Sequence, residues 1–151
     1  MLRPSKKLVL ALEAVADIAY HGGAEPVQSQ DIARRLVLPR RYLEQVMQQL
    51  VRAGILRGVR GPRGGYRLAR ERRRVSVGDV VRVVRGIEDL PAQEDLASSS
   101  KLGRRVIGPF WAATEQELMA RLDRVTIDDL CRRAEEQGVA SESQRSVDYA
   151  L

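Results

Sequence analysis

Five polar residues recur at spacings that place them on one face of a helix: Arg40, Arg41, Glu44, Gln45 and Gln48. Such side chains can pair with base edges in a DNA major groove, arginine with guanine, glutamine with adenine and glutamate with cytosine. The hydroxyl of Tyr42 could bind a backbone phosphate. The alternative is that these residues only solvate the outer face of a helix bundle. The arginine-rich run that follows them favours the nucleic-acid interpretation.

That run is Val59-Arg-Gly-Pro-Arg-Gly-Gly-Tyr66. Three glycines around one proline permit a tight turn and a close approach of the backbone to another surface. Arg60 or Arg63 at the tip could enter a minor groove, where the negative potential attracts guanidinium groups. The spacing matches neither of the common glycine-rich nucleotide-binding loops. The predicted DNA contacts here are Arg57, Arg60, Gly61, Arg63, Gly64, Gly65 and Tyr66.

The charge distribution supports a polyanionic partner. The chain has 151 residues and a net charge of +6, yet residues 34–85 hold fifteen Arg, no Lys and three acidic residues. This block carries +12 and the remainder carries −6. A solvated basic face is the alternative, but a block this concentrated more often meets a polyanion.

The elements that must position these residues follow from hydrophobic periodicity. Helices are expected over residues 5–21, 29–36 and 40–53, the third burying Leu43, Val46, Met47 and Leu50. Pro26 and Val27 are expected to be extended. Residues 55–60 and 66–68 alternate as strands around the glycine-rich turn. Three helices followed by a hairpin is the order of a winged helix-turn-helix.

The second half of the chain is predicted to be helical. Ser76 with Asp79, and Thr126 with Asp129, form capping-box patterns that open helices ending at Arg85, before Gly86, and near Gln137. Between them lies an acidic loop and then a long helix that Gly108-Pro109 would kink or restart. Its apolar residues suit a dimer seam: Leu102, Val106, Phe110, Trp111, Leu118 and Leu122. An effector pocket near Trp111 is the alternative.

Four runs give the chain a specific resemblance: Arg41-Tyr-Leu-Glu-Gln45, Ala53-Gly-Ile-Leu56, Val59 to Tyr66, and Val77-Gly-Asp-Val80. They resemble the Rrf2 (IscR-like) family of bacterial winged helix-turn-helix transcriptional regulators, over roughly residues 5–135. The resemblance implies a homodimer that reads a palindromic site, with a long helix crossing between subunits. It also implies that Tyr42, Glu44 and Gln45 lie on the recognition helix, that Glu44 discriminates sequence, and that Arg60 enters the minor groove.

The resemblance also sets the expected organisation. The fold class is mostly α with a small β-hairpin, a winged helix-turn-helix plus a long dimerisation helix. We divide the chain into a DNA-binding domain (1–86), a loop equivalent to the family's cluster-binding loop (87–101), the dimerisation and terminal helices (102–138) and a flexible tail (139–151).

The chain differs from cluster-binding members of the family in the residues that would hold the cofactor. Cluster-binding relatives carry three closely spaced cysteines in the loop before the long helix, whereas residues 86–105 contain neither Cys nor His. An iron–sulfur cluster needs about four protein ligands, and the whole chain offers only Cys131 and His21. We therefore expect no cofactor and no metal site. His21 is interpreted as a surface residue at a helix end.

Cys131 is the remaining redox candidate. Arg132 and Arg133 beside it could lower the pKa of its thiol, which would suit a thiol-based redox sensor. The alternative is a small buried residue that packs with its apolar neighbours, as free cysteines commonly do.

Composition narrows the function class. With one Cys and one His, the chain shows no nucleophile–base or paired-carboxylate constellation, so an enzyme is not expected. The beginning of the chain lacks the apolar run of a signal peptide or membrane span, and a reducing, cytoplasmic compartment is expected. We predict a DNA-binding repressor. The alternatives are an RNA-binding winged helix, for which aromatic residues are few, and a protein-interaction module that uses the acidic C-terminal half.

Overall fold

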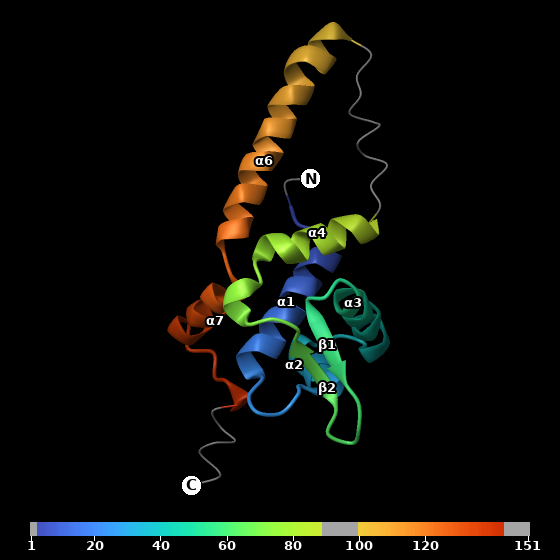
Figure 1. Cartoon of the computed structure of the whole chain (residues 1–151), viewed down its shortest axis with the longest axis vertical. Coiled ribbons are helices and arrows are strands. Elements are labelled where there is room, and N and C mark those ends of the chain that lie inside the picture. The colour runs from blue at the N-terminus through green and yellow to red at the C-terminus, as the bar shows by residue number, and fades with distance from the viewer. Residues whose placement is uncertain (1–2, 89–99, 144–151) are drawn as a thin grey trace.

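The structure, a computed structural model, describes residues 3–88 and 100–143. Helices dominate, with one β-hairpin near the middle of the chain (Figure 1). The order is α1 (Lys6–His21), α2 (Ser29–Leu36), α3 (Arg40–Arg52), β1 (Leu56–Val59), β2 (Gly65–Leu68), the 3-10 turn η1 (Arg72–Arg74), α4 (Val77–Glu88), the π-helical turn η2 (Gly103–Ile107), α6 (Gly108–Arg124) and α7 (Ile127–Glu136).

Helix α1 is the centre of the core. Ser5 caps it, because its Oγ accepts a hydrogen bond from the amide of Leu8 at 3.1 Å. The helix packs against α2, α3, α4, α7 and β2. Its fully buried side chains Ala14 and Val15 meet Ile32 of α2 and Met47 of α3 in one hydrophobic cluster. The predicted helices 5–21, 29–36 and 40–53 are confirmed to within a residue at each end.

Helices α2 and α3 are both followed by a residue with a left-handed backbone conformation, but the residue types differ. At the end of α3, Gly54 takes the left-handed φ of 77°, and the amides of Gly54 and Ile55 donate to the carbonyls of Val51 and Leu50. This is the usual glycine-based helix end. At the end of α2 the left-handed position is held by Val37, with a φ of 55°.

The hairpin pairs β1 with β2 antiparallel, with Leu56 opposite Leu68 and Arg57 opposite Arg67. Leu56 is buried against the core, so this face of the hairpin is its inner face. Val27 adds a one-residue third strand, because its amide and carbonyl both bond to Tyr66. The extended entry expected at Pro26 and Val27 is thus part of the sheet.

Helix α4 begins at the predicted capping box. Ser76 Oγ accepts from the amide of Asp79, and the Asp79 carboxylate accepts from the amide of Ser76, both at 3.0 Å. The predicted end at Arg85 is wrong, since the helix continues through Gly86 to Glu88. A single glycine lowers helix propensity by about 1 kcal/mol but does not by itself end a helix.

Helix α6 forms an arm that projects from the body (Figure 1). It begins at Gly108, directly after the π-helical turn η2, and Pro109 stands in its first turn. This confirms the predicted restart at Gly108-Pro109, because proline has no amide for the helical ladder. The C-terminal end of α6 lies against the body, where the Asp123 carboxylate accepts two hydrogen bonds from Arg82 of α4 at 2.8 and 2.6 Å.

Helix α7 and the segment after it close the structure against α1. Thr126 and Asp129 form the predicted capping box. Residues 139–143 then lie along α1 and α2, which differs from the flexible tail expected there. Ser141 is 6% exposed and donates to the carbonyl of Tyr20 at 2.8 Å, while Glu142 accepts from Arg35 at 2.6 Å. The rest of the expected tail, 144–151, lies outside the described residues, as does most of the expected 87–101 loop.

Among the described helices, none is both long and apolar enough to cross a membrane.

Candidate nucleic-acid interface

Helix α3 presents one buried and one solvent-facing side. The apolar residues Leu43, Val46, Met47 and Leu50 are all buried, as predicted. The opposite side exposes Arg40, Arg41, Tyr42, Gln45 and Gln48. Because the buried residues fix the rotation of the helix, these polar side chains point away from the core. The helix can therefore enter a groove without breaking any contact of the fold.

Glu44 is less free than the other polar residues of α3. It is half-buried and accepts a hydrogen bond from Arg40 Nε at 3.1 Å. The hydroxyl of Ser29, at the start of α2, lies 3.5 Å from the same carboxylate oxygen. These contacts hold the Glu44 carboxylate between α2 and α3. Ser29 was not among the predicted site residues, because fifteen residues separate it from Glu44 and only the helix packing brings them together.

The hairpin loop carries two exposed arginines, Arg60 and Arg63. Arg63 lies 3.7 Å from the Glu25 carboxylate, and both side chains are largely exposed, so solvent screens this pair. Arg60 precedes Gly61, which takes a φ of 115°. The wing thus offers two guanidinium groups at the end of the hairpin.

The structure shows why glycine is required at two of the predicted wing positions. A Cβ at Gly64 would clash with the carbonyl of Val59, and one at Gly65 would clash with the carbonyl of Val27. Tyr66 is half-buried against the core, and burial raises the pKa of its hydroxyl. Arg57 is exposed on the outer face of the hairpin, opposite Arg67. Gly64, Gly65 and Tyr66 therefore shape the wing, whereas Arg60 and Arg63 are exposed at its end.

The apolar residues of the arm are exposed in this chain. Within α6 no residue is buried, and Phe110 is 62% exposed. Leu102 is 65% exposed, while Val106, Trp111 and Leu118 are also exposed and Leu122 is half-buried. The rings of Phe110 and Trp111 meet edge to face at 5.9 Å. The structure therefore leaves the predicted seam uncovered along most of the arm.

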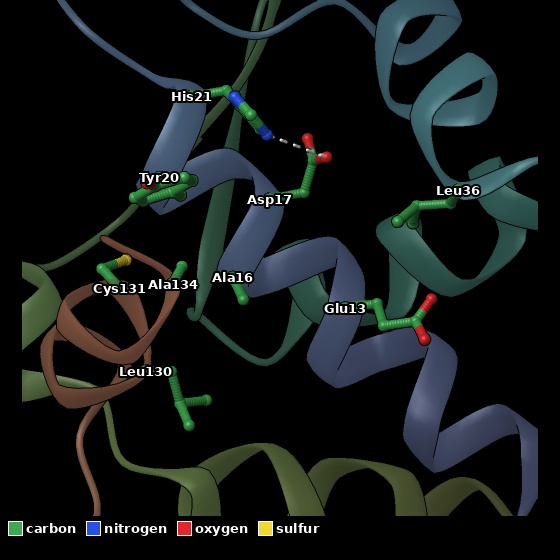
Figure 2. A pocket seen from close by; sticks show the side chains of 9 residues that line it. All are labelled: Glu13, Ala16, Asp17, Tyr20, His21, Leu36, Leu130, Cys131 and Ala134. Carbon is green, nitrogen blue, oxygen red and sulfur yellow. Dashed lines mark ion pairs between the residues drawn. The ribbon is translucent and has the colours of Figure 1, made fainter. Parts of the chain in front are cut away.

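Cys131 lies on α7 and faces α1, beside a pocket of about 160 Å³ between α1, α2 and α7 (Figure 2). It is 3% exposed, and burial raises the pKa of its thiol, only partly opposed by Arg72. The idea that Arg132 and Arg133 lower this pKa is wrong. Cys131 fits the alternative of a small buried residue.

His21, predicted at the surface, is largely buried in the same region. Its Nδ1 accepts a hydrogen bond from the amide of Glu142 at 3.1 Å, and its Nε2 lies 3.9 Å from Asp17 (Figure 2). Asp17 in turn accepts two hydrogen bonds from Arg35 at 2.9 and 2.8 Å. His21 is thus committed to holding the C-terminal segment.

The donor set does not suit a thiolate-bound iron–sulfur cluster. Cys131 is the sole cysteine and His21 the sole histidine of the chain, and both are packed in the core region just described. In the part of the chain that the structure describes, no group of three or more His, Cys, Asp and Glu side chains could hold a metal ion.

A polar helix face beside an arginine-tipped hairpin, on a three-helix core, defines a winged-helix DNA-binding protein. The chain matches the model of the Rrf2 family, described as iron-dependent transcriptional regulators, over residues 4–133. It therefore belongs to the Rrf2 family. The chain is a DNA-binding transcriptional regulator and not an enzyme.

Individual relatives agree with this assignment. Protein rrf2 of Nitratidesulfovibrio vulgaris is 31% identical over 119 residues, which span 78% of this chain and 79% of that protein. The HTH-type transcriptional regulator IscR of Pectobacterium atrosepticum is 30% identical over 139 residues, 92% of this chain and 85% of that one.

Solved structures show the same fold. The T. potens IscR structure has a TM-score of 0.73 and 35% identity, covering 92% of this chain and 93% of that chain. The structure of CymR, the global cysteine regulator of B. subtilis, has a TM-score of 0.71 and 28% identity, covering 88% and 98%.

Proposed function

We propose that this regulator is a homodimer that represses transcription by binding a palindromic operator, without a conventional iron–sulfur cluster. The observation that carries the proposal is the face of α3, where Arg41, Gln45 and Gln48 stand exposed opposite a fully buried stripe. Each of these side chains can read a base edge. The exposed Arg60 of the wing supports a second contact in the adjacent minor groove. Such binding would take place in the bacterial cytoplasm.

The arm supports the homodimer. Helix α6 has no buried residue and leaves Phe110, Trp111 and Leu118 exposed to water, and Leu102 just before the π-helical turn is exposed as well. Surfaces of this kind usually mark an interface. A second copy of the same helix covers it with matching chemistry under two-fold symmetry. Two-fold symmetry then requires an inverted repeat in the DNA.

The proposed absence of an iron–sulfur cluster rests on the lack of side chains that could serve as its ligands. The family description includes iron dependence, but residues 86–105 supply no Cys or His in this chain. An ultraviolet–visible spectrum and iron analysis of protein purified without oxygen test this point. We expect no visible absorption and no bound iron. A reproducible chromophore with stoichiometric iron would overturn this part of the proposal.

The alternative of a thiol switch has less support. Burial raises the pKa of Cys131 and keeps the thiol protonated, which slows oxidation. Because Cys131 is the sole cysteine, a disulfide switch would have to join two subunits, and the buried position of Cys131 opposes such a bond.

The decisive experiment is selection of bound sequences from a random duplex library. The wild type should enrich an inverted repeat. Gln45→Ala should lose about 1–3 kcal/mol of discrimination at one base pair of each half-site, whereas Gln137→Ala, the same change at the exposed residue directly after α7, should select the wild-type motif. An enriched motif without symmetry would contradict the dimer, and an unchanged motif for Gln45→Ala would contradict the role of α3.

Repression is tested separately by transcription in vitro. A promoter that overlaps the selected repeat should give less transcript as the protein is added. An increase in transcript would show activation and overturn the repressor assignment, while leaving the DNA-binding assignment in place.

A further inference from the structure

A second pocket, of about 260 Å³, lies between the end of α1, the strand β2 and the residues that lead into η1. Four arginines line it, and we call it the arginine pocket: Arg57, Arg67, Arg70 and Arg72. Two carboxylates, Glu25 and Glu71, also reach its wall, and its floor includes the backbone of Gly22 and Gly23.

Two of these arginines form an unusual pair. Arg57 of β1 stands directly opposite Arg67 of β2, so both side chains leave the hairpin on the same face. Like charges directly opposite each other destabilise a strand pair. The sheet therefore tolerates a repulsion at the cross-strand pair of which both members line the pocket.

No acidic side chain neutralises this pair within the described residues. Glu25 is paired instead with Arg63 at 3.7 Å. Arg70 lies 3.8 Å from Asp79 and Arg72 lies 2.7 Å from Asp128, so these two already have partners. Across the described part of the chain, neither Arg57 nor Arg67 takes part in an ion pair. Among the described residues, the Arg67 guanidinium donates a hydrogen bond to the carbonyl of Ala24, which is a neutral acceptor.

The pocket is separate from the proposed DNA-reading face. None of its lining residues comes from α3. The hairpin packs against α3 through β1 and against α1 through β2, and the pocket opens beside β2 and the end of α1. An anion held here would thus lie behind the wing rather than in front of the exposed face of α3.

We propose that the arginine pocket binds a phosphate group, carried by a small molecule. Guanidinium forks bind phosphate oxygens through paired, charge-assisted hydrogen bonds, and a phosphate between Arg57 and Arg67 would replace their repulsion by attraction to a shared anion. The volume is slightly below the roughly 300–1,000 Å³ of common ligand pockets, which suits a small occupant. The same chemistry is present in the DNA backbone, and the experiment below separates the two sources.

The test uses inorganic phosphate as the probe and the full-length protein. Thermal unfolding and titration calorimetry are run in phosphate and in chloride at equal ionic strength. Phosphate should raise the Tm of the wild type and of Arg74→Gln, an exposed arginine of η1 outside the pocket. Arg57→Gln and Arg67→Gln should each weaken phosphate binding about tenfold or more, because each removes a charge-assisted contact.

The Tm measured without phosphate gives a second test of the proposal. At low ionic strength without phosphate, Arg57→Gln should unfold at the same or a higher Tm than the wild type, because it removes the cross-strand repulsion. A phosphate response of equal size in the wild type and in both pocket variants would overturn the proposal. So would the lack of any response in the wild type. Neither outcome depends on DNA binding or dimerisation.

The source of the phosphate is read from DNA affinity as a function of salt. If the occupant is a free small molecule, Arg67→Gln, which removes a pocket arginine outside the predicted DNA contacts, should leave the slope of log K against log[salt] unchanged. If it is a DNA phosphate, the slope should fall by about one in Arg67→Gln and not in Arg74→Gln. The second result would overturn the small-molecule source and extend the DNA interface to the back of the wing.

Discussion

At the scale of single residues, Val37 adopts a backbone conformation that is unfavourable for a β-branched residue. It sits in the turn between α2 and α3 with a φ of 55° and a ψ of 53°, and it is 85% exposed. A left-handed conformation costs an L-residue with a Cβ about 1–2 kcal/mol, and β-branched residues adopt it rarely. The amide of Leu38 still bonds to the carbonyl of Ala33 at 3.1 Å, so the turn keeps its helix-end geometry.

Val37→Gly should therefore stabilise the protein by about 1 kcal/mol, since glycine adopts the left-handed region freely and the lost side chain contacts little. Urea unfolding followed by circular dichroism measures the change. The matched control is Val9→Gly, at an exposed position inside α1, which should destabilise by about 1 kcal/mol. Equal destabilisation by both variants would show that Val37 carries no conformational strain.

Cys131 yields a second prediction at this scale. Because the thiol is buried and its pKa is raised, alkylation in the folded protein should be at least about a hundredfold slower than in urea, since it must wait for an opening of the structure. Diamide treatment should leave DNA affinity unchanged in the wild type. A loss of affinity that Cys131→Ser prevents would instead support the thiol switch.

At the scale of elements, the contact between α1 and residues 139–143 links the end of the chain to the helix-turn-helix. Ser141 and Glu142 bond to the backbone of Tyr20 and to the ring of His21. Glu142 also accepts from Arg35 of α2, whose guanidinium bridges to the buried Asp17. The segment therefore ties α7, and through it the arm, to the first helix of the DNA-binding motif.

This contact makes stability depend on pH through His21. Burial lowers the pKa of His21 below its ordinary 6.5, aided by Arg35 and opposed by Asp17 and Glu142. The unfolded chain thus binds a proton at a higher pH than the folded protein does. The His21 contribution is fully present above about pH 6.5 and is lost as the pH falls through and below that value. Protonation would also remove the Nδ1 lone pair that accepts from Glu142.

We therefore expect the free energy of unfolding of the wild type to fall between pH 7.5 and pH 5. The fall should be smaller in His21→Gln, which keeps a neutral acceptor at every pH. Urea unfolding of both proteins at several pH values isolates the contribution of His21 to the free energy of unfolding. Parallel curves for both proteins would assign the pH dependence to other groups.

How far the sequence predicts these elements depends on the range of the interactions. Helices α1 to α3, the hairpin and both capping boxes follow from spacing and local hydrogen bonding, and the structure confirms them. The end of α4 does not follow, because a glycine such as Gly86 only weakens a helix. The position of residues 139–143 also does not, because Ser141 meets Tyr20 across 121 residues of sequence. Contacts between residues so far apart in the sequence leave no local sequence pattern.

The same distinction holds for the candidate interface. Periodicity alone placed Arg41, Gln45 and Gln48 on the exposed side of α3, since the buried stripe dictates the opposite face. It could not show that Ser29 and Arg40 restrain Glu44, or that Gly64 and Gly65 are required by the carbonyls of Val59 and Val27. It also could not show that Arg57 and Arg67 share one pocket, which depends on strand register.

At the scale of the whole molecule, basic charge and apolar surface are separated. The block of residues 34–85 carries a net charge of +12 and includes α3 and the hairpin, in the body of the molecule. The exposed apolar residues of α6 lie on the projecting arm (Figure 1). In the proposed homodimer, each copy would present its DNA-binding surface while its arm binds the second copy. Binding of two half-sites would then depend on the arm as much as on the arginines.

This coupling gives a prediction in which salt reports the number of subunits on the DNA. Phe110→Glu places a charge in the arm seam and should give a monomer by analytical ultracentrifugation, whereas Gln116→Glu adds the same charge at an exposed polar position of α6 and should remain dimeric. Each phosphate contact adds about −0.9 to the slope of log K against log[salt]. A monomer on one half-site makes half the contacts, so Phe110→Glu should show about half the wild-type slope and far weaker binding, because the second half-site no longer adds avidity. Fluorescence anisotropy over a salt series measures both quantities. A monomeric variant that kept the full slope would mean that one subunit makes all the phosphate contacts, and the two-fold arrangement on DNA would have to be abandoned.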